Sequence, residues 1–209
     1  MLSLACLCAF GFLGVVYFVF GDAGAGARGP TEFDRSIAQL LQQHRSRELT
    51  GRVIEVSALG SAPILVVLAL FAYSIILRAR DRVGFLHLSI ALAGGAAWSR
   101  LLQHLFDRAR PEDLIPSIVV TKGSFPSAHL FGATAAYATF AFFYARYAPG
   151  RNAEVACYAL ASVIVLLIGA TRIYLGAHHA TDVIAGIAAG AAWAFLVAAV
   201  FSIWYHPPA

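Results

Sequence analysis

The chain has 209 residues, of which 60% are hydrophobic and only 12% are charged, with a formal net charge of +4. A soluble domain has roughly 25% charged residues, so this composition excludes an ordinary soluble enzyme and predicts a polytopic membrane protein. The length fits a single domain, 1–209. Because the positive charge of a membrane protein reflects topology and headgroup contact, we expect no nucleic-acid partner.

Six apolar runs follow one another along the chain, each near the ~20 residues that an α-helix needs to cross a bilayer. They predict an all-α membrane bundle of about six transmembrane helices. The runs are Leu2–Phe20, Ser57–Leu77, Val83–Phe106, Ala128–Tyr147, Ala153–Thr171 and Val183–Tyr205.

The segment between the first two runs has a different pattern. Over residues 31–50, apolar side chains recur at helical spacing with polar residues between them: Phe33, Ile37, Leu40 and Leu41. This pattern predicts a short amphipathic helix on the membrane surface, with Thr31 as its N-cap. A plain connecting helix fits the same residues equally well.

The charges of the connecting segments predict the orientation of the chain. The short connections Arg78–Arg82 and Arg146–Arg151 are rich in arginine and should be cytoplasmic. The connections Asp107–Ser127 and Arg172–Asp182 then face the opposite side. Compactness and the lack of a targeting extension favour a bacterial inner membrane, with that opposite face toward the periplasm or exterior.

Three short polar blocks interrupt the apolar runs, at 108–111, 125–129 and 171–182. Charged and polar residues are costly beside a bilayer, so their presence there indicates function. The predicted threading gathers all three blocks on the extracytoplasmic face. Two of them open helices, whose N-terminal N–H groups suit a bound phosphate. The blocks therefore predict one phosphate-handling site.

His178 and Asp182 are four residues apart and share one face if a helix begins near Gly176. This spacing favours a histidine nucleophile whose other ring nitrogen donates to the carboxylate. His179 is close enough for the same role, but its spacing to Asp182 is a weaker match. A capping aspartate beside an unrelated histidine is the alternative.

His129 lies two residues after Ser127 at the start of the fourth run. A second histidine on the same face can act as general acid toward the leaving oxygen, and the Ser127 hydroxyl can donate to a phosphate oxygen. The alternatives are a structural histidine and a serine that caps the helix.

The arginines of the blocks provide planar, permanently charged groups for phosphate oxygens. Arg110 and Arg172 are the main candidates, and Arg108 and Lys122 are further cations on the same face. Each arginine alone would be interpreted as a solvated charge or a lipid anchor. Their coincidence with two histidines favours phosphate binding.

These blocks resemble the signature of the type 2 phosphatidic acid phosphatase and vanadium haloperoxidase superfamily, K-x6-R-P, P-S-G-H and S-R-x5-H-x3-D. Here the second block is Pro126-Ser127-Ala128-His129, and the third has Thr171-Arg172, His178 and Asp182 at the family spacing. The six-run layout is similar to the membrane branch of the family. The lysine of the first block is replaced by neutral Gln103, which removes a cation from the predicted site.

The resemblance implies roles residue by residue: His178 as a nucleophile that forms a phosphohistidine, Asp182 as its orienting partner and His129 as general acid. Arg110, Ser127 and Arg172 would bind the phosphate, with Lys122, Arg108 and Gln103 as further candidates. Family catalysis needs no metal, so no cofactor is expected.

The sequence thus favours an integral membrane phosphatase acting on a lipid phosphate or diphosphate at the outer leaflet. Candidate substrates are undecaprenyl diphosphate, phosphatidic acid, phosphatidylglycerophosphate and lipid A phosphates. A lipid phosphotransferase would use the same residues. From other classes, a small transporter would place polar residues inside the spans, and the loss of the lysine at Gln103 leaves room for an inactive scaffold.

Overall fold

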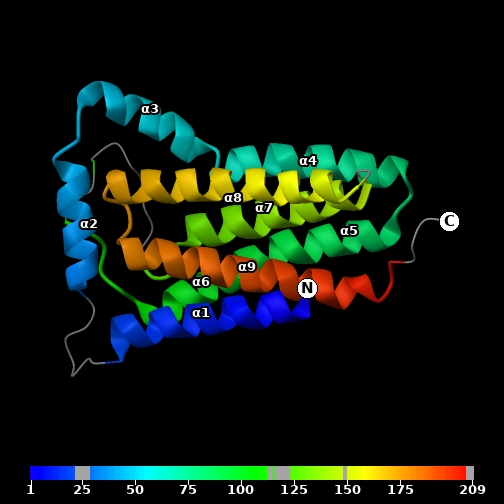
Figure 1. The fold of residues 1–209 in the computed structure, drawn as a ribbon, viewed down its shortest axis with the longest axis horizontal. Coiled ribbons are helices and arrows are strands. Elements are labelled where there is room, and N and C mark those ends of the chain that lie inside the picture. Colours follow the sequence, from blue (N-terminus) through cyan, green and yellow to red (C-terminus); the bar gives the residue numbers. More distant parts are fainter. Residues whose placement is uncertain (22–28, 113–114, 116–122, 148–149, 206–209) are drawn as a thin grey trace.

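The structure, a computed structural model, describes residues 1–21, 29–112, 115, 123–147 and 150–205. Every regular element in these ranges is helical, which confirms the predicted all-α class. The long helices run side by side, and two shorter ones, α2 and α3, cover one end of the bundle (Figure 1). That end holds the predicted site.

The long elements follow the predicted apolar runs closely, since runs of this length form helices of about 30 Å. The helices that follow single runs are α1 Leu2–Phe20, α4 Ala62–Arg78, α7 Ala128–Tyr147, α8 Arg151–Tyr174 and α9 Ala180–Ser202. The third run forms one continuous stretch of three elements, α5 Arg82–Ser89, a π-helical turn at Ile90–Gly94 and α6 Gly95–Phe106. The second run begins later than predicted, at Ala62, because Ser61 stands at the N-cap with Pro63 in the first turn.

Five helical stretches of the described residues are long and apolar enough to cross a membrane: Leu2–Phe20, Arg47–Arg78, Arg82–Phe106, Arg151–Tyr174 and Ala180–Ser202. The sixth predicted span, α7, is not among them. His129, Thr134 and Thr139 reduce its apolar character. Since α7 packs against α6, α8 and α9, and residues such as Leu130 are fully buried, much of its surface contacts protein.

The prediction of one helix over residues 31–50 is wrong, because the chain forms two. Helix α2 spans Glu32–Gln42, and Thr31 caps it as predicted: its hydroxyl accepts from the Asp34 N–H, and the Asp34 carboxylate accepts from the Thr31 N–H. Helix α3 spans Arg47–Ala58 and is capped by Ser46. The second cap ends any continuation of α2.

Close contact between α7 and α9 fixes the geometry at the covered end. An added Cβ at Gly186 would lie 2.7 Å from the Ser127 carbonyl oxygen, and one at Gly190 would lie 2.6 Å from that of Phe131. Two glycines four residues apart let helices approach in a membrane protein. The approach allows the Ser127 N–H to donate to the Asp182 carbonyl oxygen at 3.0 Å.

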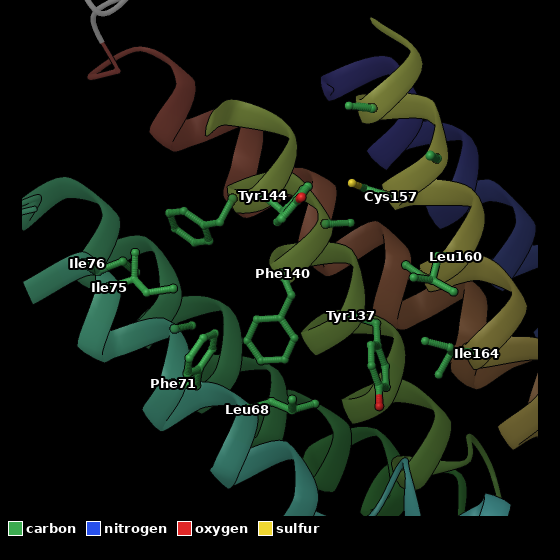
Figure 2. A pocket seen from close by; sticks show the side chains of 16 residues that line it. Leu68, Phe71, Ile75, Ile76, Tyr137, Phe140, Tyr144, Cys157, Leu160 and Ile164 are labelled. Carbon is green, nitrogen blue, oxygen red and sulfur yellow. The ribbon is translucent and has the colours of Figure 1, made fainter. Parts of the chain in front are cut away.

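An apolar groove of about 880 Å³ lies between α4, α7 and α8. Figure 2 shows side chains such as Leu68, Tyr137 and Leu160 around it. Along α7, the groove begins at Tyr137, eight residues after His129, which corresponds to about 12 Å of helix. It is therefore within a few turns of the covered end.

Candidate active site

The three polar blocks meet at the end of the bundle covered by α2 and α3 (Figure 1). Arg108 and Arg110 follow α6, His129 lies in the first turn of α7, and Arg172 lies in the last turn of α8. The connection from α8 to α9 carries His178. The α9 N-terminus also lies here, with the partial positive charge of its helix dipole; its first N–H groups are held by carboxylates, since His179 N–H donates to Asp182 and Thr181 N–H donates to Asp34.

His178 is 3% exposed and its two ring nitrogens have different neighbours. Nδ1 lies 3.0 Å from the Ser124 carbonyl oxygen and 3.8 Å from Asp182 Oδ2. Since a carbonyl only accepts, Nδ1 carries the proton. Nε2 lies 3.3 Å from Arg110 NH1, so its lone pair faces the arginine. Burial lowers the pKa of His178 more than Asp182 raises it.

The predicted direct hydrogen bond from His178 to Asp182 is thus replaced by one to the Ser124 carbonyl. The reason is that other donors occupy the carboxylate. Oδ2 accepts from the Ser124 hydroxyl and from the His179 N–H at 2.9 Å, and Oδ1 accepts from Arg108 at 2.6 Å. Asp182 therefore acts on His178 through its charge at close range, while Ser124 supplies the hydrogen bond.

Arg108 does not lie where a phosphate-binding residue would. It is 1% exposed, and its guanidinium is enclosed by protein oxygens. NH1 donates to Asp182 and to the Thr181 hydroxyl, and NH2 donates to the Gly29 carbonyl and to Asp34 at 2.8 Å. The interpretation of Arg108 as a further phosphate cation is therefore wrong. It is a buried partner of two carboxylates.

Arg110 and Arg172, the main predicted phosphate ligands, lie beside His178 and Ser57 respectively. The Ala177 and Gly123 carbonyls hold the Arg110 guanidinium at 2.5 and 2.8 Å. Burial lowers the pKa of Arg110, but an arginine remains charged at physiological pH. Arg172 is 8% exposed, its NH1 lies 3.3 Å from the Ser57 hydroxyl, and its Nε has no partner among the described residues.

His129 approaches the same centre from α7. Its Nε2 lies 3.1 Å from the Ser57 carbonyl oxygen, so this nitrogen carries a proton. Arg172 and His178 are close enough to act on it electrostatically. An added Cβ at Gly60 would lie 2.6 Å from Nε2, so the turn after α3 closes directly over this ring.

Three candidates have other placements. Ser127 is fully buried and its hydroxyl lies 3.4 Å from the Leu130 N–H, a long contact in the position of a helix cap. Gln103 donates from Nε2 to the Pro126 carbonyl at 3.2 Å, which ties α6 to the second block. Lys122 lies outside the described residues.

His179, the alternative nucleophile, is turned toward a different set of groups. Its backbone N–H holds Asp182, and its ring interacts electrostatically with Arg108 and Asp34. Burial lowers its pKa. Only His178 of the two histidines has a ring nitrogen beside Arg110, so the geometry favours His178.

The sequence interpretation missed four residues that build this site: Asp34, Ser57, Ser124 and Thr181. Asp34 lies in the predicted amphipathic segment 31–50, and its hydrogen bonds to Thr181 join residues 147 positions apart. Ser57 and Ser124 each contribute a carbonyl oxygen, to His129 and to His178, and also a hydroxyl, to Arg172 and to Asp182. No local pattern distinguishes such residues from ordinary caps and turns.

Comparison with known proteins places this geometry in a family. The PAP2 superfamily matches residues 82–205, which include all three blocks. Phosphatidylglycerophosphatase B of Bacillus subtilis is 35% identical over 100 residues, 47% of this chain and 49% of the relative. Lipid A 1-phosphatase of Rhizobium johnstonii is 35% identical over 127 residues, 56% of this chain and 47% of the relative. The chain spans about half the length of these curated relatives.

Two solved structures share the fold. A transmembrane PAP2-type phosphatidylglycerolphosphate phosphatase from Bacillus subtilis superimposes with a TM-score of 0.83 and 24% identity, covering 97% of this chain and 98% of the other. LpxE from Aquifex aeolicus superimposes with a TM-score of 0.62 and 19% identity, covering 87% of this chain and 99% of the other. At these identities the likeness concerns the fold. Together with the family match over more than half of the sequence, it leads to one conclusion: the chain belongs to the PAP2 superfamily.

Proposed function

We propose that this protein is an integral membrane phosphatase that removes a phosphate or diphosphate headgroup from a lipid, through a phosphohistidine at His178. The observation that carries the proposal is the pairing of His178 Nε2 with Arg110 at 3.3 Å beside Arg172, a buried guanidinium with no carboxylate partner among the described residues. Burying such a charge is costly without an anion, and a phosphate supplies one.

The first step follows from these positions. The Nε2 lone pair of His178 attacks phosphorus while the bond from phosphorus to the lipid oxygen breaks. Arg110 and Arg172 stabilise the charge on the phosphoryl oxygens, and Asp182 stabilises the positive imidazole ring that forms. His129 donates a proton to the leaving oxygen, which departs as the lipid alcohol from a phosphomonoester or as the lipid monophosphate from a diphosphate.

The second step regenerates the site. Water attacks the phosphohistidine, the bond from phosphorus to Nε2 breaks, and His129 takes the proton of the water. Inorganic phosphate leaves, and His178 returns to the form with its proton on Nδ1. A lipid hydroxyl in place of water would give phosphotransfer with the same residues.

The orientation of the site supports action at the outer leaflet. The end of α4, the start of α5, the end of α7 and the start of α8, which carry the arginines of the two short connections, lie at the end of the bundle opposite the site (Figure 1). By the positive-inside rule, those connections are cytoplasmic. The proposed site then faces the periplasm or exterior of a bacterial inner membrane.

The substrate class follows from the relatives and the groove. The curated relatives are named for phosphatidylglycerophosphate and lipid A, and both of these lipids carry phosphate on an apolar anchor. The groove of Figure 2 is lined by apolar side chains of α4, α7 and α8 and begins about 12 Å along α7 from His129. We assign it to the hydrocarbon tail of the substrate.

A panel assay of the purified protein tests the proposal. Phosphatidylglycerophosphate, phosphatidic acid, undecaprenyl diphosphate and lipid A are supplied in turn, with and without a lipid acceptor, and released inorganic phosphate is measured. His178→Ala and His129→Ala should each reduce kcat by about 10²-fold or more, and vanadate should inhibit.

The matched control is His104→Ala, which removes an exposed histidine of α6 that makes no hydrogen bond or ion pair with the site among the described residues, and should leave turnover unchanged. Full turnover by His178→Ala would refute the nucleophile. Transfer of phosphate to the acceptor in place of release would redefine the enzyme as a phosphotransferase.

A further inference from the structure

Asp34 on α2 is 2% exposed, although it belongs to a helix that the sequence places on the surface. Five donors surround its carboxylate. Thr31 donates its N–H and its hydroxyl, Arg108 donates NH2 at 2.8 Å, and Thr181 donates its N–H at 2.9 Å and its hydroxyl at 3.0 Å. Burial alone would raise the pKa of Asp34. The hydrogen bonds and the charge of Arg108 outweigh that effect, so the pKa lies below its ordinary value and the carboxylate is ionised.

Arg108 joins this carboxylate to the proposed catalytic centre. One of its nitrogens holds Asp34 at 2.8 Å and the other holds Asp182 at 2.6 Å, with all three side chains inaccessible to solvent. Asp182 in turn lies 3.8 Å from His178 Nδ1. A continuous chain of charges therefore runs from α2 to the ring that is proposed to attack phosphorus.

The charges of this cluster do not cancel. Two carboxylates share one guanidinium, so one net negative charge stays buried beside His178. If Asp34 were neutral, Arg108 would offset Asp182 completely, and the cluster would offer no net charge to a positive imidazole. In a buried site such a difference is weakly screened.

We infer that Asp34 is a positioning residue of this site, which orients Arg108 and Thr181 and keeps the charge of Asp182 available to His178. The inference rests on the proposed function, because it assigns Asp34 to the step in which His178 becomes positive. It gives α2 a role in the chemistry: the helix supplies a second carboxylate beside Asp182, the one carboxylate of the three polar blocks that binds Arg108.

His178 is also surrounded by other groups that titrate or carry charge. They are Asp182 on α9, Arg172 on α8, His129 on α7 and Arg110 after α6. His179, next in the chain, also titrates and interacts with Asp34, so the readout must be specific to His178. Asp182, Arg172, His129 and Arg110 are not substituted in an Asp34 variant. A shift in the titration of His178 would therefore report the charge of the cluster.

The test compares Asp34→Asn with Asp34→Glu, which keeps the charge. Asp34→Asn should lower kcat about 10- to 100-fold, as expected for loss of one charge-assisted contact, with a smaller change in KM. In the pH profile of kcat/KM, the fall on acidification (the acid limb) should move to lower pH by about one unit, because the protonated form of His178 is less stabilised and its pKa falls. Asp34→Glu should keep the limb of the wild type.

Two further variants separate charge from structure. Thr31→Ala removes a hydroxyl that donates to Asp34 and weakens the α2 cap, yet it leaves every charge in place. It should lower the thermal midpoint without moving the acid limb. Asp34→Asn combined with Arg108→Gln restores one net negative charge and should return the limb toward its wild-type position.

An equal loss of kcat in Asp34→Asn and Thr31→Ala, with neither limb moved, would overturn the inference and leave Asp34 a structural residue. If Asp34→Asn does not fold, Asp34→Glu serves instead: a shift of its acid limb of kcat/KM away from that of the wild type would also overturn the inference. The pH dependence of carbethoxylation at His178, followed by peptide mass spectrometry, reports the same titration without turnover. An inactive wild type would therefore refute the proposed function, while the shift between wild type and Asp34→Asn would still decide the role of Asp34.

Discussion

At the residue scale, the proton on Nδ1 of His178 is fixed by a backbone carbonyl. The Ser124 carbonyl oxygen accepts a hydrogen bond from Nδ1 with an N···O distance of 3.0 Å, and the Ser124 hydroxyl donates to Asp182. One residue thus sets the tautomer of the ring and the position of the carboxylate. The Nε2 lone pair is left toward Arg110, which is the arrangement that an attack on phosphorus requires.

The titration of His178 leads to a prediction about pH. Burial lowers its pKa below the ordinary value of 6.5, so the ring stays neutral to lower pH than a free histidine. Protonation of Nε2 removes the lone pair. The rate kcat/KM should therefore fall on acidification only below about pH 6.5.

The profile is measured with a lipid phosphate and corrected for the second ionisation of phosphate, which lies near pH 6. A corrected acid limb above pH 6.5 would contradict the assignment, because it would require a raised pKa at the essential base.

Residue patterns in the sequence were informative where function depends on side chains at short spacing. His178 and Asp182 were predicted to lie together, and His178 Nδ1 lies 3.8 Å from Asp182 Oδ2. The helix that was expected to begin near Gly176 begins at Ala180, so His178 precedes it and the loop between α8 and α9 brings the two side chains together. Arg108 was misplaced, because a cation two residues before Arg110 looks equivalent to it. Only the fold shows that Arg108 faces Asp34 and Asp182.

At the scale of elements, the approach of α9 to α7 positions the site. Gly190 faces the Phe131 carbonyl oxygen so closely that a Cβ would lie 2.6 Å away. A Cβ added at Gly132 on α7 would instead meet open space, with no heavy atom of the described residues within 4 Å. These two glycines offer a matched comparison.

Gly190→Ala should destabilise the protein by about 1–3 kcal/mol, because backbone must move to admit the methyl group. The displacement of α9 should lower phosphate release as well. Gly132→Ala should be tolerated, or slightly stabilising, since alanine favours helix. Thermal unfolding in detergent measures both variants, and an equal midpoint for the two would contradict the close contact.

The groove between α4, α7 and α8 gives a second prediction at this scale. Ala161 lines the groove, whereas Ala159 is exposed on α8 and does not line it. Ala161→Phe should fill the space proposed for the lipid tail. Its kcat/KM should fall about tenfold for long-chain lipid phosphates, and less for a short-chain soluble analogue.

Ala159→Phe adds the same volume on the same helix and should leave both substrates unaffected. The comparison requires the two variants at equal detergent concentration. Equal kcat/KM values for Ala161→Phe and Ala159→Phe would place the tail elsewhere.

The elements themselves were predictable to different degrees. The apolar runs predicted α1 and α7 with the observed bounds, because long runs must form helices in lipid. The division of residues 31–58 into α2 and α3 was missed. Ser46 caps α3 locally. A tertiary contact that the sequence does not show adds to this cap: the Tyr174 carbonyl accepts from Arg45 and the Tyr174 hydroxyl accepts from the Ser46 N–H, which stabilises the turn between the two helices.

At the scale of the whole molecule, the bundle brings together side chains that the sequence separates widely. Arg108, Asp34 and Asp182 form one buried ion cluster from three elements. A lone buried ion pair is weak support for stability, since desolvation offsets attraction. Its position beside His178 is better explained by the charge that it presents to the ring.

The central claim is that His178 carries the phosphoryl group between the two steps. The most direct measurement is to react the purified protein with a lipid substrate labelled in its phosphate, quench it, and locate the label by peptide mass spectrometry. The account predicts an acid-labile phosphoryl group on His178, absent from His178→Ala and present in His104→Ala. A label on another residue, or turnover with no label on His178 under conditions that trap the first step, would contradict it.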